Sequence, residues 1–142
     1  MKNQYNYLVI DDDSHNNLIV NMTLKRYFAP LDINVFTKPL EGLEFIKNMH
    51  GKIRHTILLL DINMPVMSGW DFLGEFEKLD PEIQDQFTIC MLSSSVDDRD
   101  FTKAKHYKSV DGYMVKPLKK DIFLDLLGHL QLNNIEAFGD IE

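Results

Sequence analysis

Four short apolar segments of this chain end in polar residues whose types suit phosphoryl chemistry. In chain order, these residues are Asp11, Asp12, Asp13, Asp61, Ser93 and Lys116. A carboxylate can attack phosphorus to form an aspartyl phosphate, and this transfer needs positioning and charge neutralisation more than covalent help. Lysine supplies positive charge, and a serine hydroxyl can donate to a phosphoryl oxygen. Each residue alone has an ordinary explanation as a cap, a turn residue or a surface charge, whereas their joint placement indicates a shared site.

The acids in this set predict a site for a hard divalent cation. Carboxylates that share one rim repel one another. Mg²⁺ relieves that repulsion, because it takes one or two carboxylates, retained waters and a phosphate as ligands. The chain shows no cluster of histidine and cysteine at the spacing of zinc ligands. Asp13 stands directly before a helical segment and is predicted to be its N-cap.

Short apolar runs alternate along the chain with longer segments in which apolar residues recur at helical spacing. The run at 56–60 is continuous and apolar, as expected for a strand that is covered on both faces. The predicted strands are 7–10, 33–36, 56–60, 87–92 and 112–115, and the predicted helices are 14–28, 40–49, 70–76, 97–107 and 119–132.

This alternation predicts a doubly wound α/β fold, a (βα)5 sandwich of the flavodoxin-like kind. Right-handed crossovers favour a five-stranded parallel sheet, and the strand order 2-1-3-4-5 is the common solution at this length. Ligands of such sheets bind beyond the carboxyl ends of the strands, at the switch between the first and third. The polar residues should therefore converge at one rim. Asp61 is the favoured nucleophile because the third strand is central, although the residues alone leave Asp12 open.

Length and composition place the chain among globular proteins. Its 142 residues, 44% hydrophobic and 26% charged, suffice for a single domain, with a core over about 5–132 and a C-terminal tail over 133–142. The net charge of −7 argues against a protein that binds duplex DNA directly. Cys90 is the only cysteine, which excludes a disulfide framework and fits a reducing compartment. No stretch of about 20 apolar residues could span a bilayer, so we expect a cytoplasmic protein without membrane insertion.

The strand-end residues in their sequence context resemble the receiver domain of two-component response regulators. The resemblance covers about residues 5–132 and agrees in order, spacing and strand context. Its most specific parts are Asp-x-x-Met-Pro-x-Met-x-Gly from Asp61 to Gly69 and the Lys116–Pro117 pair after the fifth strand. The matching segments are Leu8 to Asp13, Leu59 to Gly69, Met91 to Ser94 and Gly112 to Pro117.

The resemblance implies a role for each of these positions. Asp61 would be the phosphoacceptor, and Lys116 would pair with it and then with its phosphoryl group. Ser93 would be the switch hydroxyl, and Tyr113 the aromatic partner that turns inward when Ser93 moves. The Lys116–Pro117 peptide would be cis. The implied Mg²⁺ ligands are Asp12, Asp61, the backbone carbonyl of Asn63 and, through a coordinated water, Asp11.

These roles imply a phosphorylation-activated switch of a two-component phosphorelay, with at most weak self-catalysed phosphorylation and dephosphorylation rather than enzyme activity. A histidine kinase or a histidine phosphotransfer protein would donate the phosphoryl group. Phosphorylation would reshape the face formed by the fourth predicted helix, the fifth strand and the last helix, over about 97–132. The residues after that helix are too few for a DNA-binding module. Output would therefore pass through a partner protein or through self-association into a homodimer.

Three other functions are weighed against this one. A phosphorylation-independent docking module of receiver fold usually lacks the acceptor, an acidic partner or the lysine, all of which are present here. A Mg²⁺-dependent phosphatase of the haloacid-dehalogenase type needs Asp-x-Asp-x-Thr/Val, which matches neither Asp11 to His15 nor Asp61 with Asn63. A flavin or nucleotide domain needs a glycine-rich loop where the acids stand.

The segment 75–86 is long for the family, and we expect either an extended helix or a partner-specific loop there.

Overall fold

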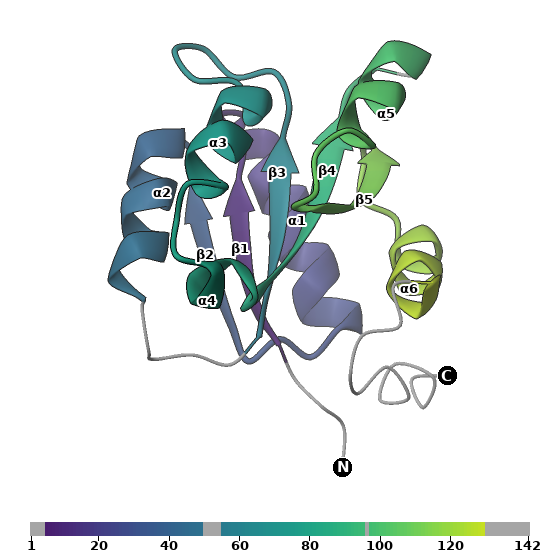
Figure 1. Cartoon of the computed structure of the whole chain (residues 1–142). Coiled ribbons are helices and arrows are strands. Elements are labelled where there is room, and N and C mark those ends of the chain that lie inside the picture. The colour runs from purple at the N-terminus through teal and green to yellow at the C-terminus, as the bar shows by residue number, and fades with distance from the viewer. Residues whose placement is uncertain (1–4, 50–54, 96, 130–142) are drawn as a thin grey trace.

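Five parallel strands form one sheet in the order β2-β1-β3-β4-β5 (Figure 1). The computed structural model describes residues 5–49, 55–95 and 97–129 of the chain. Its strands are β1 (Asn6–Ile10), β2 (Asp32–Phe36), β3 (Thr56–Asp61), β4 (Phe87–Ser93) and β5 (Val110–Val115). The predicted flavodoxin-like order is confirmed, with β3 at the centre of the sheet.

Helices cover both faces of this sheet (Figure 1). They are α1 (Ser14–Tyr27), α2 (Pro39–Asn48), α3 (Gly69–Phe76), α4 (Pro81–Gln84), α5 (Asp98–Ala104) and α6 (Lys120–His129). On one face, Val20 and Leu24 of α1 and Phe123 of α6 share a core with residues of β1, β3 and β4. On the other face, Leu43 of α2 and Phe72 of α3 do the same. Within the described ranges, no helix is long and apolar enough to cross a bilayer.

The apolar sequence of β3 explains its central position. Every residue from Thr56 to Asp61 is buried. Leu59 belongs to the core under α1 and α6, whereas Leu58 and Leu60 belong to the opposite core, as the alternation of a strand requires. Fully burying a leucine side chain is worth about 1.5–3 kcal/mol, so these residues oppose any move of β3 to an edge. The strand therefore ends with Asp61 at a fixed place on the rim.

Side-chain caps set the start of two helices beside that rim. Asp13 accepts hydrogen bonds from the backbone N–H groups of His15 at 3.0 Å and Asn16 at 3.4 Å, which confirms its predicted role as the N-cap of α1. At α3, the Ser68 N–H donates to the Asp71 carboxylate and the Asp71 N–H donates to Ser68 Oγ, each at 3.1 Å. This reciprocal capping box fixes where the loop after β3 becomes a helix.

The segment 75–86 is not one extended helix, so that alternative is wrong, and a partner-specific segment stays an expectation. α3 ends at Phe76, and the separate one-turn helix α4 follows. The Asp80 carboxylate caps α4 by accepting the Glu82 N–H at 3.3 Å, and Pro81 suits the first helical position. A helix this short shows no apolar period, which is why the sequence pattern did not reveal it.

Several predicted boundaries also differ from the observed ones, and the largest shift is in α5, which ends at Ala104 rather than at 107. β5 begins at Val110 rather than at 112. The register of β4 and β5 shifts between Ile89 and Cys90, and the Asp111 carboxylate accepts the Ile89 N–H at 2.9 Å. The last helix was predicted over 119–132, and α6 is described from Lys120 to His129. The remainder of that prediction and the 133–142 tail lie outside the described residues.

Candidate functional site

Parallel pairing brings the acids that follow β1 and end β3 to the same edge of the sheet. Ile10 and Leu60 are paired in register, so Asp11 and Asp61 come next at neighbouring positions. These two residues are 1% and 3% exposed, while Asp12 is exposed. Burying a carboxylate is costly unless it is paired and hydrogen-bonded. The rim therefore requires a compensating charge.

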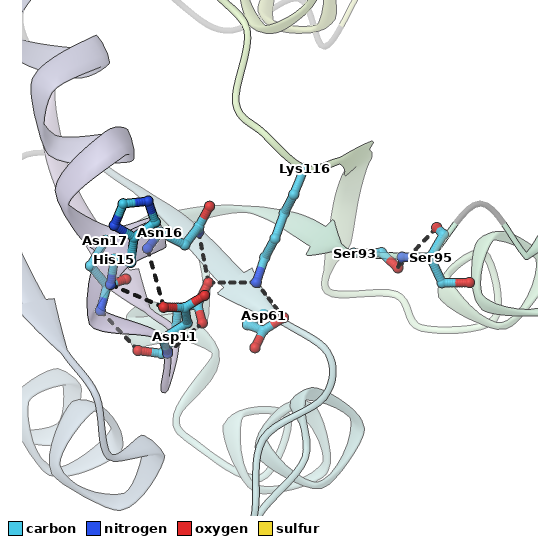
Figure 2. Close-up of polar contacts among 9 residues, drawn as sticks. Asp11, His15, Asn16, Asn17, Asp61, Ser93, Ser95 and Lys116 are labelled. Carbon is cyan, nitrogen blue, oxygen red and sulfur yellow. Dashed lines mark hydrogen bonds and ion pairs between the residues drawn. The ribbon is translucent and has the colours of Figure 1, made fainter.

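Lys116 supplies this charge from the end of β5. Its backbone N–H donates to the Ser93 carbonyl at 2.7 Å, which fixes the base of the side chain. Its Nζ lies 2.7 Å from Asp11 Oδ2 and 3.1 Å from Asp61 Oδ1 (Figure 2), and 15% of the side chain is exposed. The expected contact of Lys116 with Asp61 is present, and the shorter one to Asp11 was not predicted. The Lys116–Pro117 peptide is cis, as the resemblance implied.

The mixture of burial and charge changes the acidity of this cluster. Burial raises the pKa of Asp61 to about 7; the neighbouring Asp11 charge adds to the rise, and Lys116 opposes it. Burial also disfavours the charged form of Lys116, but its two carboxylate partners outweigh this effect and raise its pKa. One cation thus faces two buried carboxylates and an exposed one. The surplus negative charge favours binding of a further cation.

The oxygen atoms available here fit a hard divalent cation. Carboxylate oxygens of Asp11, Asp12 and Asp61 all lie within 4.8 Å of one another. Mg²⁺ takes such ligands and keeps several waters, which the exposed side of Asp12 admits. Asn63 is exposed in the loop after β3, two residues beyond Asp61. Its backbone carbonyl stays an expected ligand from the resemblance.

Two asparagines that the sequence analysis missed hold Asp11 in place. Asn16 Nδ2 donates to Asp11 Oδ2 at 2.8 Å, and Asn17 Nδ2 donates to the Asp11 carbonyl at 2.9 Å (Figure 2). The Asp13 N–H completes the set by donating to Asp11 Oδ1 at 2.9 Å. Both asparagines are buried in the first turn of α1. Two adjacent amides, three and four residues after the acidic triplet, were the signal that could have identified them.

The residues predicted to form the switch lie outside the carboxylate–lysine cluster. Ser93 is buried, and its hydroxyl donates to the Ser95 carbonyl at 3.2 Å and accepts from the Ser95 N–H at 3.0 Å. Figure 2 shows this pair standing apart from the Lys116 bridge. The half-buried Tyr113 meets the Phe101 ring edge-on, with centroids 5.5 Å apart. Its buried hydroxyl has no hydrogen-bond partner in the described part of the chain.

Gly69, the last residue of the motif from Asp61 to Gly69, lets α3 start close behind Asp61. Its N–H donates to the Ile62 carbonyl at 2.7 Å, and a Cβ at this position would overlap the Asp61 carbonyl oxygen. We expect Gly69→Ala to lower the free energy of unfolding by about 2 kcal/mol, because backbone atoms must shift to make room. Urea unfolding at equilibrium measures this loss.

Gly74 provides a matched control in the same helix. A Cβ there would meet no atom within 4 Å, so Gly74→Ala should gain about 0.5–1 kcal/mol from the higher helix propensity of alanine. Equal stabilities for the two alanine variants would contradict the steric role of Gly69.

Sequence comparison connects the chain to known signalling proteins. The family described as "Response regulator receiver domain" matches residues 7–127. Sensor histidine kinase CheAY of Helicobacter pylori is 40% identical over 138 residues, covering 96% of this chain and 16% of that protein. Transcriptional regulatory protein PrrA of Mycobacterium leprae is 35% identical over 112 residues, covering 78% of this chain and 42% of that protein. The chain thus spans less than half the length of these curated relatives.

Solved structures share the same architecture. A response regulator receiver protein from Dyadobacter fermentans matches with a TM-score of 0.83 and 19% identity, over 91% of this chain and 99% of that one. A two-component response regulator from Cytophaga hutchinsonii matches with a TM-score of 0.81 and 27% identity, over 90% and 98%. The family match over most of the chain agrees with the cluster of acids and lysine at the sheet edge. This chain belongs to the response regulator receiver family of two-component signalling.

Proposed function

We propose that this chain is a phosphorylation-activated switch whose phosphoacceptor is Asp61. The observation that carries the proposal is the Lys116 bridge between Asp61 and Asp11, next to the exposed Asp12. Receiver domains are generally phosphoacceptors rather than true enzymes, and they generally bind Mg²⁺ at an acidic pocket. The buried pair, its lysine and the adjoining exposed acid provide the parts that such chemistry needs.

In the proposed reaction, an Asp61 carboxylate oxygen attacks the phosphorus of a phosphohistidine on a histidine kinase or histidine phosphotransfer protein. The O–P bond forms as the P–N bond breaks, and the released imidazole takes a proton from solvent. The attacking carboxylate must be ionised, and its raised pKa leaves part of it protonated near neutral pH unless positive charge is added. Lys116 would follow the negative charge from the carboxylate to the phosphoryl oxygens.

A bound Mg²⁺ would supply the remaining positive charge and orient the phosphoryl oxygens. Asp11 Oδ2 already accepts from Lys116 and Asn16. These contacts support a role for Asp11 through a coordinated water rather than as a direct ligand. The direct ligands we assign are Asp12, Asp61 and the backbone carbonyl of Asn63.

The output step would begin at Ser93. To bond a phosphoryl oxygen on Asp61, its hydroxyl must leave Ser95, and the space it vacates would admit Tyr113. The face of α5, β5 and α6 would then change shape. Its exposed apolar side chains suit a partner protein or a second copy of the chain. They are Phe101, Val115 and Ile122.

The proposed switch acts through protein contacts rather than through nucleic acid. A net charge of −7 disfavours approach to a phosphate backbone. We therefore propose that residues 5–132 work as one receiver domain, which receives its phosphoryl group from one protein and passes the signal to another or to a second copy of itself.

Intact-mass spectrometry after incubation with phosphoramidate or acetyl phosphate tests this function. We expect one adduct on the wild-type chain that is stable in acid, labile in base and dependent on Mg²⁺. Asp61→Asn should form none, since it lacks the nucleophile. Asp12→Asn keeps the nucleophile but loses a metal ligand, so its adduct should form more slowly.

Two outcomes would change the assignment. The absence of an adduct under every condition would contradict the phosphorylation switch and favour a docking module of receiver fold. An adduct that persists in Asp61→Asn would place the acceptor on another aspartate.

A further inference from the structure

The buried carboxylate of Asp11 has two donors on one oxygen atom. Lys116 Nζ lies 2.7 Å from Asp11 Oδ2, and Asn16 Nδ2 donates to the same oxygen at 2.8 Å (Figure 2). The other oxygen, Oδ1, accepts the Asp13 N–H at 2.9 Å. Asp11 is 1% exposed, so water has little access to replace a donor that is lost. The ammonium and the amide therefore stabilise one buried negative charge together.

The proposed reaction draws one of these two donors away. Lys116 Nζ also lies 3.1 Å from Asp61 Oδ1, and in the function proposed above it would follow the negative charge to the phosphoryl oxygens on Asp61. That movement weakens its contact with Asp11. Removing the partner of a buried charge is strongly destabilising when nothing compensates for it. The cost of moving Lys116 thus depends on what stays bonded to Asp11.

Asn16 is placed to stay on Asp11 when Lys116 moves. It belongs to the first turn of α1, which the Asp13 cap fixes, so its position does not depend on β5. Its side chain is 7% exposed. A hydrogen bond to a charged group is stronger than one between neutral groups. Because both donors draw on the charge of the same oxygen, the amide bond should strengthen as the ammonium leaves.

We propose that Asn16 is a positioning residue that stabilises the Asp11 charge and thereby frees Lys116 to serve the phosphoryl group on Asp61. The inference rests on the proposed function of Asp61. Asn16 touches neither the phosphorus nor the metal ion in this assignment, and it acts through Asp11. Without the amide, Lys116 would be held more firmly by Asp11, and the phosphorylated state would be harder to reach.

Asn17 provides a matched comparison at the next position of α1. It is 5% exposed, and its Nδ2 also donates to Asp11, at 2.9 Å. The acceptor is the backbone carbonyl of Asp11, however, and not its carboxylate. Loss of this bond should weaken the fold to an extent that does not depend on whether Lys116 is present.

Unfolding with and without the ammonium tests the role of Asn16 in the absence of metal and phosphodonor. Lys116→Met combined with Asp61→Asn leaves the Asp11 carboxylate with its amide but without its cation. In this background, Asn16→Ala should raise the unfolding equilibrium constant about tenfold more than it does in the wild type, because the two donors compensate for each other. Asn17→Ala should raise it equally in both backgrounds. Urea unfolding in EDTA near pH 8 measures each of these changes.

Phosphorylation by phosphoramidate tests the same role during the reaction. At saturating Mg²⁺, Asn16→Ala should lower the maximal rate about tenfold, which is the effect of losing one hydrogen bond to a charged group. The Mg²⁺ concentration that gives half the maximal rate should change less than about twofold, because Asp11 is not among the direct ligands that we assign. Asn16→Leu, which fills the space without a donor, should behave in the same way. Asn21→Ala, at a half-buried asparagine further along α1, is the control and should keep both wild-type values.

The possible outcomes separate this proposal from the function on which it rests. An Asn16→Ala cost that is equal in the two backgrounds, or a wild-type maximal rate in Asn16→Ala and Asn16→Leu, overturns the role of the amide. A higher Mg²⁺ requirement with an unchanged maximal rate also overturns it, because Asn16 would then act on the metal site. Failure of the wild-type chain to react with phosphoramidate would instead count against the proposed function, while the unfolding comparison would still measure the support that Asn16 gives to Asp11.

Discussion

Lys116→Met is expected to lower the free energy of unfolding by about 3–5 kcal/mol near pH 8 without divalent cations. The ammonium lies 2.7 Å from Asp11 and 3.1 Å from Asp61, and both carboxylates are buried. Methionine fills a similar volume but leaves the two acids facing each other without that charge. The folded site would then take up a proton, so the loss should shrink toward pH 5, where protonation is easier. Urea unfolding in EDTA near both pH values measures the two effects.

Two further variants separate the charge effect from packing. Lys116→Met combined with Asp61→Asn leaves one buried carboxylate, which the Asn16 amide still supports, and should recover most of the lost stability. Lys47→Met replaces an exposed lysine of α2 and should change the free energy of unfolding by less than about 0.5 kcal/mol. If Lys116→Met were as stable as Lys47→Met, the bridge would contribute nothing to the fold.

Asp61→Asn is expected to gain stability over the wild type as pH rises from about 4 to about 7. Burial and the Asp11 charge raise the pKa of Asp61 from 3.8 to about 7, so the folded state binds this proton more tightly than the unfolded chain. Between these two values the unfolded chain loses its proton first, and the stability of the wild type falls as pH rises. Above the pKa of Asp61 in the folded state, the difference in stability between Asp61→Asn and the wild type no longer changes with pH. A rise of about three pKa units limits this difference in the free energy of unfolding to about 4 kcal/mol.

Urea unfolding of both proteins across this pH range, in EDTA, measures the effect. Asp121→Asn, at a side chain 90% exposed, is the control and should track the wild type. Added Mg²⁺ should raise the stability of the wild type near pH 8 more than that of Asp61→Asn, since the ion binds the ionised acid in the folded state. A stability difference that stays flat from acid to neutral pH would show that the pKa of Asp61 is not raised.

The order of the elements and the chemistry of the rim could be predicted from the amino-acid sequence. The apolar run of β3 is fully buried only between two layers of helices, which places Asp61 at the carboxyl end of the central strand. Parallel strands then bring Asp11 beside it, whatever the intervening segments do. The Asp13 cap was also predictable, because capping depends on neighbours within a few residues. These features depend on neighbouring residues or on a periodic pattern, so they can be predicted from the sequence.

The contacts among the polar groups of the rim could not be predicted from the sequence and are seen first in the folded chain. Lys116 bonds Asp11 more closely than Asp61, and Asn16 shares the same Asp11 oxygen, because three strand ends and a helix start crowd one small volume. The two hydrogen bonds between Ser93 and Ser95 depend on backbone angles that residue types do not specify. The φ of 73° at Val66 is likewise a feature that its residue type does not predict. Contacts between segments distant in sequence, and the strain they impose, are set by packing in three dimensions.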